Sequence, residues 1–275
     1  MSVPVPGRPA AFVLVSTNHG TMIVNRNDYR MVGENAGYGV GFQLMNTSSY
    51  DQGEVTLTME LLRARRANYR EPVVAIDCGA NIGVYTVEWA RLMRGWGSVY
   101  AYEPQEKIYY ALAGNVALNN CFNVTARLAA IGAHCGKLAV PQVDYCVPSS
   151  FGSLELVEAD ANEYIGQNID YSRPAQDVEL LTIDSLQLAR IDLLKIDVEG
   201  MELEVLEGAR ESILRSRPEI LVEVIKTDEK AVSKMLEAAG YRCFSMGMNI
   251  LAVHTSDPVL GQLTSGHAFG ASTKT

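Results

Sequence analysis

The stretch that most constrains the fold is residues 73–86, which read Val-Val-Ala-Ile-Asp-Cys-Gly-Ala-Asn-Ile-Gly-Val-Tyr-Thr. A run of apolar, β-forming residues ends at Asp77, a glycine-containing turn follows, and a helical pattern begins at once. This order of strand, tight turn and helix N-terminus binds nucleotide-like cofactors at the carboxyl end of a parallel strand. Residues 73–86 therefore predict a doubly wound α/β sheet with a cofactor site at the turn.

The residues within the turn indicate which cofactor binds. A dinucleotide-binding turn needs glycine at positions 79, 81 and 84, because the second glycine lets the backbone approach a pyrophosphate. Here Asn81 and Val84 replace the second and third glycines, and Asp77 lies where phosphate charges would be, which costs free energy. S-adenosylmethionine carries an ammonium and a sulfonium but no phosphate, so this turn predicts a methyltransferase. The predicted cofactor-binding residues here are Asp77, Cys78, Gly79, Ala80, Asn81, Gly83 and Tyr85.

The rest of the chain alternates between strand-like and helix-like segments. After the first strand we expect parallel strands at 98–102, 123–130, 191–196 and 219–224, and a terminal strand pair at 241–246 and 249–254. Helices are expected at 50–68, 82–93, 105–118, 201–215 and 229–239. This pattern predicts a mostly parallel, seven-stranded Rossmann-like sheet of the methyltransferase type, whose last strand inserts antiparallel.

Three regions lie outside this alternation. Residues 1–50 should form an N-terminal β-hairpin, at 11–16 and 20–25, with an irregular cover over 26–50, and His19 in the hairpin turn is expected at the surface. Within the predicted methyltransferase domain, 51–256, the stretch 131–178 interrupts the pattern, with β-like pieces at 137–140 and 153–157. Such an excursion is either a substrate lid or a small packed β-extension. Residues 257–275 should form a flexible tail.

Composition and charge exclude several function classes. The chain has 275 residues, 48% of them hydrophobic, and a net charge of −9, which argues against nucleic-acid binding. The one short basic cluster, residues 63–66, is expected on a solvated helix face. Five cysteines without CxxC spacing argue against zinc and disulfides and favour a reducing, cytoplasmic location. The apolar run 10–15 is too short for a signal core or a membrane span, so we expect a soluble, unexported protein.

Two further segments carry charged residues at the ends of predicted strands. Glu103 and Pro104 directly follow the second parallel strand, 20 residues after Gly83, where an acid accepts hydrogen bonds from both ribose hydroxyls of an adenosyl ligand. Lys195 and Asp197 share one face of a buried strand, which is costly unless the charges are paired or functional. Lys195 could form a structural ion pair with Glu223, near the end of the neighbouring strand.

The segments around these residues resemble the FkbM-type methyltransferases. They are residues 76–83, Tyr102-Glu103-Pro104, residues 180–186, and residues 195–202 (Lys-Ile-Asp-Val-Glu-Gly-Met-Glu) continuing to 206–209. The Asp-x-Glu-Gly-x-Glu core of the last segment is the most specific, and the resemblance spans roughly residues 50–255. It implies an S-adenosylmethionine-dependent transferase that methylates hydroxyls of sugars, glycolipids or polyketide products. By that resemblance the 77–83 turn frames the methionine end of the cofactor, Glu103 holds the ribose and Asp197 faces the methyl donor.

Methyl transfer to a hydroxyl requires in-line positioning and removal of the hydroxyl proton. Asp197 is our first candidate for the base, with Lys195 and Glu199 beside it as further catalytic candidates. Asp197, Glu199 and Glu223 could instead hold a magnesium ion, whereas Glu199 and Glu202 could simply favour the N-terminus of the next helix. For the acceptor, a small molecule or glycan, we single out Ser149, Phe151 and Ser153; the alternative for residues 149–153 is a plain turn.

Two other functions fit the same fold. One is an NAD(P)-dependent oxidoreductase, against which Asp77, Asn81 and Val84 argue. The other is a non-catalytic protein that binds an adenosyl ligand or a partner, because a fold does not fix a function.

Overall fold

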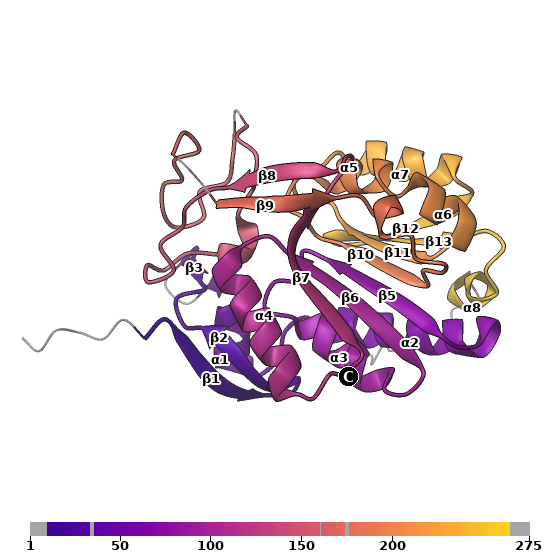
Figure 1. Cartoon of the computed structure of the whole chain (residues 1–275), viewed down its shortest axis with the longest axis horizontal. Coiled ribbons are helices and arrows are strands. Elements are labelled where there is room, and N and C mark those ends of the chain that lie inside the picture. Colours follow the sequence, from indigo (N-terminus) through magenta and orange to yellow (C-terminus); the bar gives the residue numbers. More distant parts are fainter. Residues whose placement is uncertain (1–9, 34–35, 160, 174–175, 265–275) are drawn as a thin grey trace, which may run out of the picture.

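The computed structural model describes residues 10–33, 36–159, 161–173 and 176–264 and is built around one mixed sheet. The sheet has nine strands in the order β12-β13-β11-β10-β5-β6-β7-β9-β8 (Figure 1). The predicted parallel strands are all present: β5 (Val73–Cys78), β6 (Gly97–Glu103), β7 (Val124–Ile131), β10 (Leu193–Ile196) and β11 (Glu219–Glu223). The terminal pair is β12 (Tyr241–Met246) and β13 (Asn249–His254), and β13 runs antiparallel to β11, as predicted.

The sheet extends beyond the seven predicted strands. The insertion contributes β8 (Gly136–Val140) at its beginning and β9 (Gln176–Leu181) at its end. β9 pairs parallel to β7, and β8 pairs antiparallel to β9. The seven-stranded core is therefore confirmed, and the insertion lengthens the sheet at its β7 edge. The predicted β-like piece at 153–157 is wrong, because a 3₁₀ turn at Phe151–Ser153 and irregular chain lie there.

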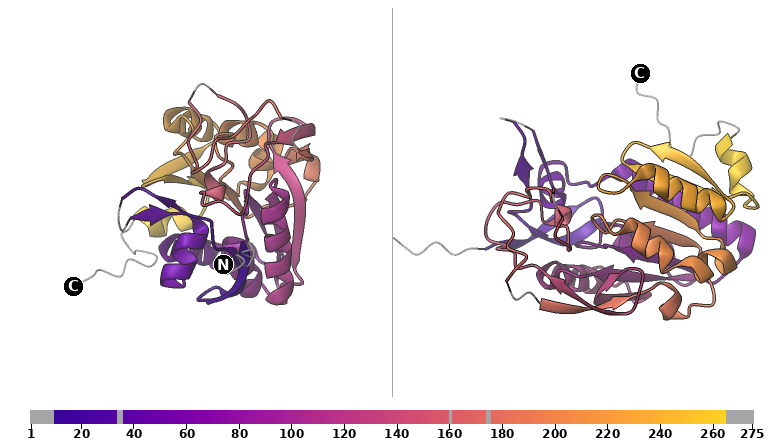
Figure 2. Two further views of the ribbon diagram at one scale, coloured as in Figure 1. Left: turned by 90° about the vertical axis from the view of Figure 1, so that its left-hand side faces the viewer. Right: turned by 90° about the horizontal axis from the view of Figure 1, so that it is seen from above.

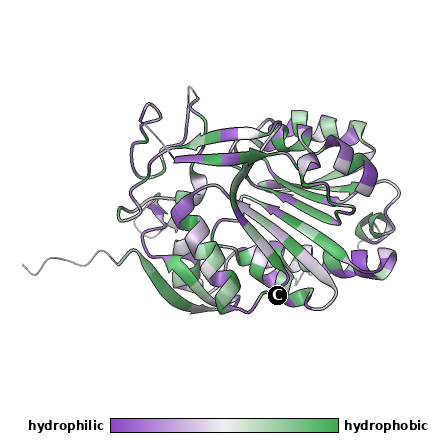
Figure 3. Cartoon of the chain, in the orientation of Figure 1, coloured by the Kyte–Doolittle hydropathy of each residue, from purple (hydrophilic) through white to green (hydrophobic). Residues whose placement is uncertain are grey.

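Helices cover both faces of the sheet (Figures 1 and 2). One face carries α2 (Gln52–Tyr69), α3 (Val84–Leu92) and α4 (Glu106–Leu118), and the other carries α5 (Glu202–Glu207), α6 (Arg210–Ser216) and α7 (Glu229–Ala238). Successive strand residues alternate between these faces: Leu193 packs among the first set of helices and Leu194 among the second. The central strands are accordingly hydrophobic along most of their length (Figure 3).

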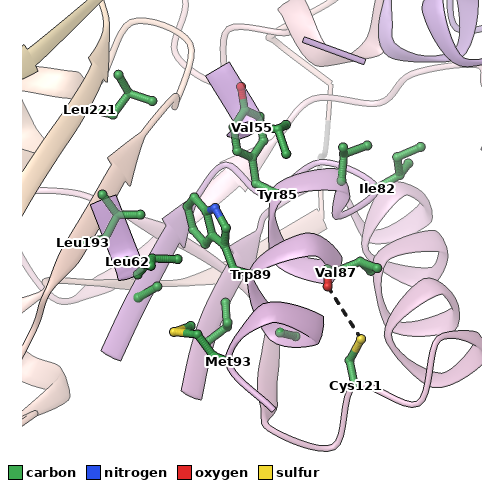
Figure 4. Close-up of a cluster of buried hydrophobic side chains, with 14 of the residues drawn as sticks. Val55, Leu62, Ile82, Tyr85, Val87, Trp89, Met93, Cys121, Leu193 and Leu221 are labelled. Atoms are coloured by element: carbon green, nitrogen blue, oxygen red, sulfur yellow. Dashed lines mark hydrogen bonds between the residues drawn. The ribbon is translucent and has the colours of Figure 1, made fainter. Parts of the chain in front are cut away.

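The larger core cluster lies between α2, α3 and the sheet (Figure 4). Trp89 of α3 is fully buried there, and its indole N–H donates a hydrogen bond of 2.9 Å to the Thr58 hydroxyl of α2. The Tyr85 ring meets Trp89 edge-on at 5.7 Å. Because Trp89 fixes the position of α3, it also fixes the turn between β5 and α3 that begins the predicted cofactor site.

The N-terminal region is more ordered than the sequence predicted. The hairpin of β1 (Phe12–Thr17) and β2 (Gly20–Asn25) is confirmed, but residues 26–50 also contain β3 (Arg30–Met31), β4 (Gly37–Tyr38) and α1 (Val40–Thr47). The surface position predicted for His19 is wrong. Its Nδ1 lies 3.0 Å from Glu88 Oε1, and its Nε2 accepts a hydrogen bond from the Tyr50 amide, so His19 is fully buried where the hairpin meets α2 and α3.

Three further features differ from the predictions. The helix expected over 201–215 divides into α5 and α6 around Gly208, where a Cβ would overlap the carbonyl oxygen of Gly132. Within the basic cluster, Arg65 is buried instead of solvated. The expected tail begins with α8 (Val259–Thr264), whose Val259 is buried, and residues 265–275 lie outside the described part. Among the helices that the structure describes, none is both long and apolar enough to cross a bilayer.

Candidate active site

A cavity of about 620 Å³ lies at the carboxyl ends of β5, β6, β10 and β11. The loops that follow these strands line it, together with residues from α1, the start of α2 and the insertion. Figure 1 shows the N-terminal strands and the insertion gathered at this end of the sheet. A volume of this size suits a cofactor-sized ligand, and this edge is where doubly wound sheets bind ligands.

The turn after β5 forms one wall of the cavity. Gly79 has φ +77°, and a Cβ at this position would overlap the carbonyl oxygen of Asp197. The amides of Gly79 and Ala80 both donate to the carbonyl of Tyr102, at 3.0 and 2.9 Å, which ties the turn to β6. Only glycine fits here, because the backbone must enter the left-handed region and pass close to the end of β10. The predicted turn residues Gly79, Ala80, Asn81, Gly83 and Tyr85 all line the cavity.

Glu103, at the end of β6, is buried and lines the same cavity. Its Oε2 accepts a hydrogen bond from the Asn81 amide at 2.9 Å, and its Oε1 accepts one from the Gln105 amide at 2.8 Å. Burial raises the pKa of Glu103 to about 7, although both backbone hydrogen bonds act to lower it. A carboxylate offers about four lone-pair sites, so each oxygen can accept one more donor. Glu103 and the neighbouring Pro104 both line the cavity, and the contact of Glu103 with ribose hydroxyls stays a prediction.

Asp77 and Cys78 lie behind the lining of the cavity, with 1% and 0% of their surfaces exposed. Asp77 Oδ2 accepts a hydrogen bond of 2.6 Å from the Thr86 hydroxyl in the first turn of α3. Burial raises the pKa of Asp77, while the adjacent Lys195 ammonium lowers it. The hydrogen bond from Thr86 to Asp77 therefore joins the end of β5 to α3 behind the cavity. Direct contact of Asp77 or Cys78 with a cofactor stays a prediction.

Lys195 and Asp197 form an ion pair of 2.7 Å at the end of β10. The predicted pairing of Lys195 with Glu223 is wrong, because the nearer Asp197 takes the ammonium. Lys195 Nζ also lies 4.8 Å from the centre of the Tyr85 ring, whose hydroxyl donates to Glu54. Burial alone lowers the pKa of Lys195, but the carboxylates of Asp197 and Asp77 outweigh it and raise that pKa above its usual value. Lys195 therefore stays charged beside Asp197.

Asp197, Glu199 and Glu223 form an acidic cluster in which one oxygen of each lies within 4.8 Å of the others. Burial, together with the charge of Asp197, raises the pKa of Glu199 to about 8 and that of Glu223 to about 9. Glu199 has φ +57°, in the left-handed region that non-glycine residues seldom adopt. Such strain is typical of functional sites. Glu202 instead accepts hydrogen bonds from the amides of Val198 and Gly200, which confirms its structural role at the start of α5.

Sequence reasoning missed Lys226, which is central to the cavity. Its Nζ lies 2.7 Å from Glu199 Oε2 and 3.1 Å from Glu163 Oε2, and it donates to the Ser153 carbonyl at 2.6 Å. Lys226 thereby joins the acidic cluster to the insertion. Its place shortly after β11, at the carboxyl edge of the sheet, is the signal that could have identified it. Glu163 lies in an irregular stretch that gives no such signal.

Only part of the predicted acceptor segment, residues 149–153, lines the cavity. Ser153 lines the cavity, whereas Ser149 and Phe151 are fully buried behind it. The Phe151 amide donates to Asp28 at 3.1 Å, and its carbonyl accepts from the Gln105 side chain at 2.9 Å. These contacts favour the packed extension over the lid. Acceptor binding by these three residues stays a prediction, which Ser153 fits best.

The geometry agrees with the comparison to known proteins. A model of the FkbM methyltransferase domain matches residues 77–243, which is more than half of the chain and includes the turn, Glu103 and the acidic cluster. The chain belongs to the FkbM methyltransferase family. This membership confirms the predicted resemblance and argues against the oxidoreductase alternative.

Individual relatives of this FkbM family member carry methyltransferase names. The chain is 25% identical over 181 residues to Methyltransferase 1 of Beauveria bassiana, covering 60% of this chain and 71% of the relative. It is 28% identical over 198 residues to Methyltransferase sdnD of Sordaria araneosa, covering 64% and 76%. A crystal structure of Methyltransferase FkbM from Methylobacillus flagellatus aligns with a TM-score of 0.45 and 15% identity, over 75% of this chain and 56% of that one.

Proposed function

We propose that this FkbM family member is an S-adenosylmethionine-dependent O-methyltransferase that acts on a hydroxyl of a sugar, glycolipid or natural product. One observation carries the proposal: the glycine turn, a buried Glu103 with free lone pairs, and the Lys195–Asp197 pair all line one cavity at the carboxyl edge of the sheet. The first two features suit an adenosyl ligand. The third supplies a charged pair where an acceptor hydroxyl would lose its proton.

The residues of the cavity fit the cofactor in charge as well as in shape. Glu103 would accept hydrogen bonds from the ribose hydroxyls, and the backbone of the Gly79–Gly83 turn would follow the methionine end. The surrounding carboxylates would attract the ammonium and sulfonium of S-adenosylmethionine. When bound, the cofactor supplies an electrophilic methyl group. The chain must then hold the acceptor oxygen in line with that methyl and exclude water.

Asp197 is the best candidate for the base. Its Oδ2 is paired with Lys195, which leaves Oδ1 to take the acceptor hydroxyl proton. Burial and the charge of Asp197 raise the pKa of both Glu199 and Glu223, and both side chains would orient acceptor hydroxyls by hydrogen bonding. We therefore assign proton removal to Asp197 and positioning of the acceptor to Glu199.

The acidic cluster also offers oxygen ligands for a divalent cation. However, Lys195 and Lys226 each lie 2.7 Å from a carboxylate oxygen of this cluster, on Asp197 and Glu199. Two of the three carboxylates thus already have a cationic partner, and the positive charges of both ammonium groups would oppose a magnesium ion there. We assign the reaction no metal-dependent step.

Calorimetry and a transfer assay test this function together. We expect S-adenosylhomocysteine to bind and the oxidised and reduced nicotinamide dinucleotides not to bind. Radiolabelled S-adenosylmethionine should transfer methyl to members of a panel of hydroxylated glycosides and alcohols, equally with EDTA and with added magnesium. Asp197→Asn should change S-adenosylhomocysteine affinity by less than about threefold and lower turnover by about 100-fold or more.

A control variant shows whether the effect is specific to Asp197. Glu204→Gln removes an exposed carboxylate of α5 and should leave both S-adenosylhomocysteine affinity and turnover unchanged. Binding of a dinucleotide alone would contradict the cofactor. Cofactor binding without transfer to any acceptor of the panel would favour the non-catalytic alternative, and normal turnover in Asp197→Asn would remove Asp197 from the mechanism.

A further inference from the structure

We infer that the acceptor is an amphiphile: a neutral, hydroxylated head lies among the carboxylates of the cavity, and an apolar portion rests on a rim formed by Ile225, Met246 and Met248. This inference rests on the proposed function and names the class of acceptor for the same site. The three rim side chains have no role in the methyl transfer proposed above.

The rim consists of three large apolar side chains that remain exposed. Ile225 is 53% exposed, Met246 38% and Met248 59%, and all three line the cavity. Ile225 lies in the loop after β11, and the two methionines lie at the turn between β12 and β13. A single exposed apolar residue is ordinary in a protein surface. Three exposed apolar side chains that line one cavity indicate a binding surface for an apolar group. Methionine side chains are flexible and adapt readily to ligands of varied shape.

The rim is continuous with the acidic cluster. Glu223 lies opposite Asn249 in the register of β11 and β13, and the Val224 amide donates to the Met248 carbonyl at 2.8 Å. The Asn249 side chain in turn donates to Glu54 at 2.6 Å. These bonds anchor the turn beside the end of β11. A molecule that presents a hydroxyl to Asp197 therefore has its remaining part directed along the adjoining rim.

The charges of the cavity select a neutral head. Six carboxylates line the region around the acidic cluster: Asp51, Glu54, Glu163, Asp197, Glu199 and Glu223. Among the described lining residues, the basic side chains are Lys195 and Lys226, and both are already paired with carboxylates. No arginine is in this lining to receive a phosphate or carboxylate of an acceptor. An anionic head would find no unpaired basic side chain among these residues, and an acidic lining disfavours its binding.

Calorimetric titration of the full chain, saturated with S-adenosylhomocysteine, tests both parts. The probes are methyl β-glucoside, octyl β-glucoside below its micelle concentration, and the anionic octyl β-glucuronide. Octyl glucoside should bind at least about tenfold more tightly than methyl glucoside because the chain covers the rim. It should also bind at least about tenfold more tightly than octyl glucuronide. Equal affinities in either pair, or no binding of octyl glucoside, would overturn the inference.

Two variants assign the effect to the rim. Met246→Ser combined with Met248→Ser should reduce the advantage of octyl over methyl glucoside to about twofold. Met45→Ser, which replaces a methionine of α1 that is 48% exposed and outside the cavity lining, should retain the full advantage. An unchanged advantage in the double variant would overturn the rim assignment. S-adenosylhomocysteine affinity, measured in each sample, separates the two proposals: if it is absent, the proposed function fails, and if it is normal, only the acceptor class is at stake.

Discussion

Two acidic side chains of the cavity, Glu103 and Asp197, lie in different electrostatic surroundings. Burial raises the pKa of Glu103 to about 7, although the two backbone N–H groups that donate to it act to lower it. Asp197 lies 2.7 Å from the buried Lys195 ammonium. Glu103 is thus poised to change its charge near neutrality, whereas Asp197 has a cationic partner. The pKa of Glu103 has a consequence for cofactor binding.

The affinity for S-adenosylhomocysteine should depend on pH through Glu103. Ribose hydroxyls are donors, so they bind the ionised carboxylate better than the protonated acid. Because the pKa of Glu103 is raised to about 7, the carboxylate is ionised at pH 8 and mostly protonated at pH 6. The affinity should therefore weaken by about tenfold as the pH falls from 8 to 6. Calorimetry at three pH values measures this dependence.

Glu103→Gln provides the reference for that titration. The variant cannot ionise and loses one acceptor for the two backbone amides, so it should bind more weakly by about tenfold at pH 8. Its affinity should stay nearly constant over the same pH range. If the variant and the native protein showed the same pH dependence, Glu103 would not be the group that titrates.

At the scale of elements, the site depends on how closely the end of β10 approaches the turn after β5. Gly79 is the point of contact, since a side chain there would overlap the carbonyl of Asp197. The Asp197 amide also donates to the Cys78 carbonyl at 3.1 Å, which holds the two strand ends together. The turn that we propose frames the cofactor and the residue that we propose faces the acceptor are therefore held together.

Gly79→Ala should destabilise the protein by far more than the cost of placing an alanine in the left-handed region, because its side chain would also overlap Asp197. Gly95 is the matched control, because it has a similar φ of +83° but lies in open space. Gly95→Ala should lower the free energy of unfolding by about 1–2 kcal/mol, the cost of a left-handed backbone. Gly79→Ala should cost clearly more and weaken S-adenosylhomocysteine binding. Urea unfolding and calorimetry compare the two, and equal losses would mean that the turn can move away from β10.

The sequence predicted those elements whose signals are local. The parallel strands follow from apolar runs such as 73–77, and the turn follows from its glycines, because both depend on residues close together in the chain. The burial of His19 and the break at Gly208 depend on Glu88 and Gly132, which are distant in sequence. The contact of Lys226 with the insertion was missed for the same reason. Lys195 and Asp197 were predicted as a site, but the sequence does not show which nearby carboxylate the Lys195 ammonium reaches, so Glu223 was expected as its partner instead of Asp197.

The whole molecule buries charge at both edges of its sheet. At the carboxyl edge the charges surround the cavity. At the amino edge, Arg65 of α2 donates to Asp192, just before β10, at 3.1 Å and to Asp257, just before α8, at 2.6 Å. Asp192 also accepts from the Val74 amide of β5. This network joins α2, β5, β10 and the C-terminal helix at the edge remote from the cavity, so its role is stability.

Arg65→Met should therefore destabilise the protein strongly without touching the cavity. The side chains of Arg65, Asp192 and Asp257 are at most 4% exposed, so the substitution leaves the buried Asp257 without its cationic partner and Asp192 paired with Arg190 alone, a loss of about 3–5 kcal/mol. Arg66→Met is the control on the same helix. Arg66 pairs with Glu71 where both side chains are 47% exposed, and such a pair is worth less than about 1 kcal/mol. Urea unfolding at neutral pH measures both losses.

A second substitution identifies the cause of the Arg65→Met loss. If the loss comes from a buried carboxylate without its partner, Arg65→Met combined with Asp257→Asn should be destabilised by less than the sum of the two single losses. A loss due to packing alone would leave the two losses additive. The affinity of the folded variant for S-adenosylhomocysteine should match that of the native protein, since the network lies at the opposite edge of the sheet. A large fall in affinity with unchanged stability would mean that the amino edge is coupled to the active site.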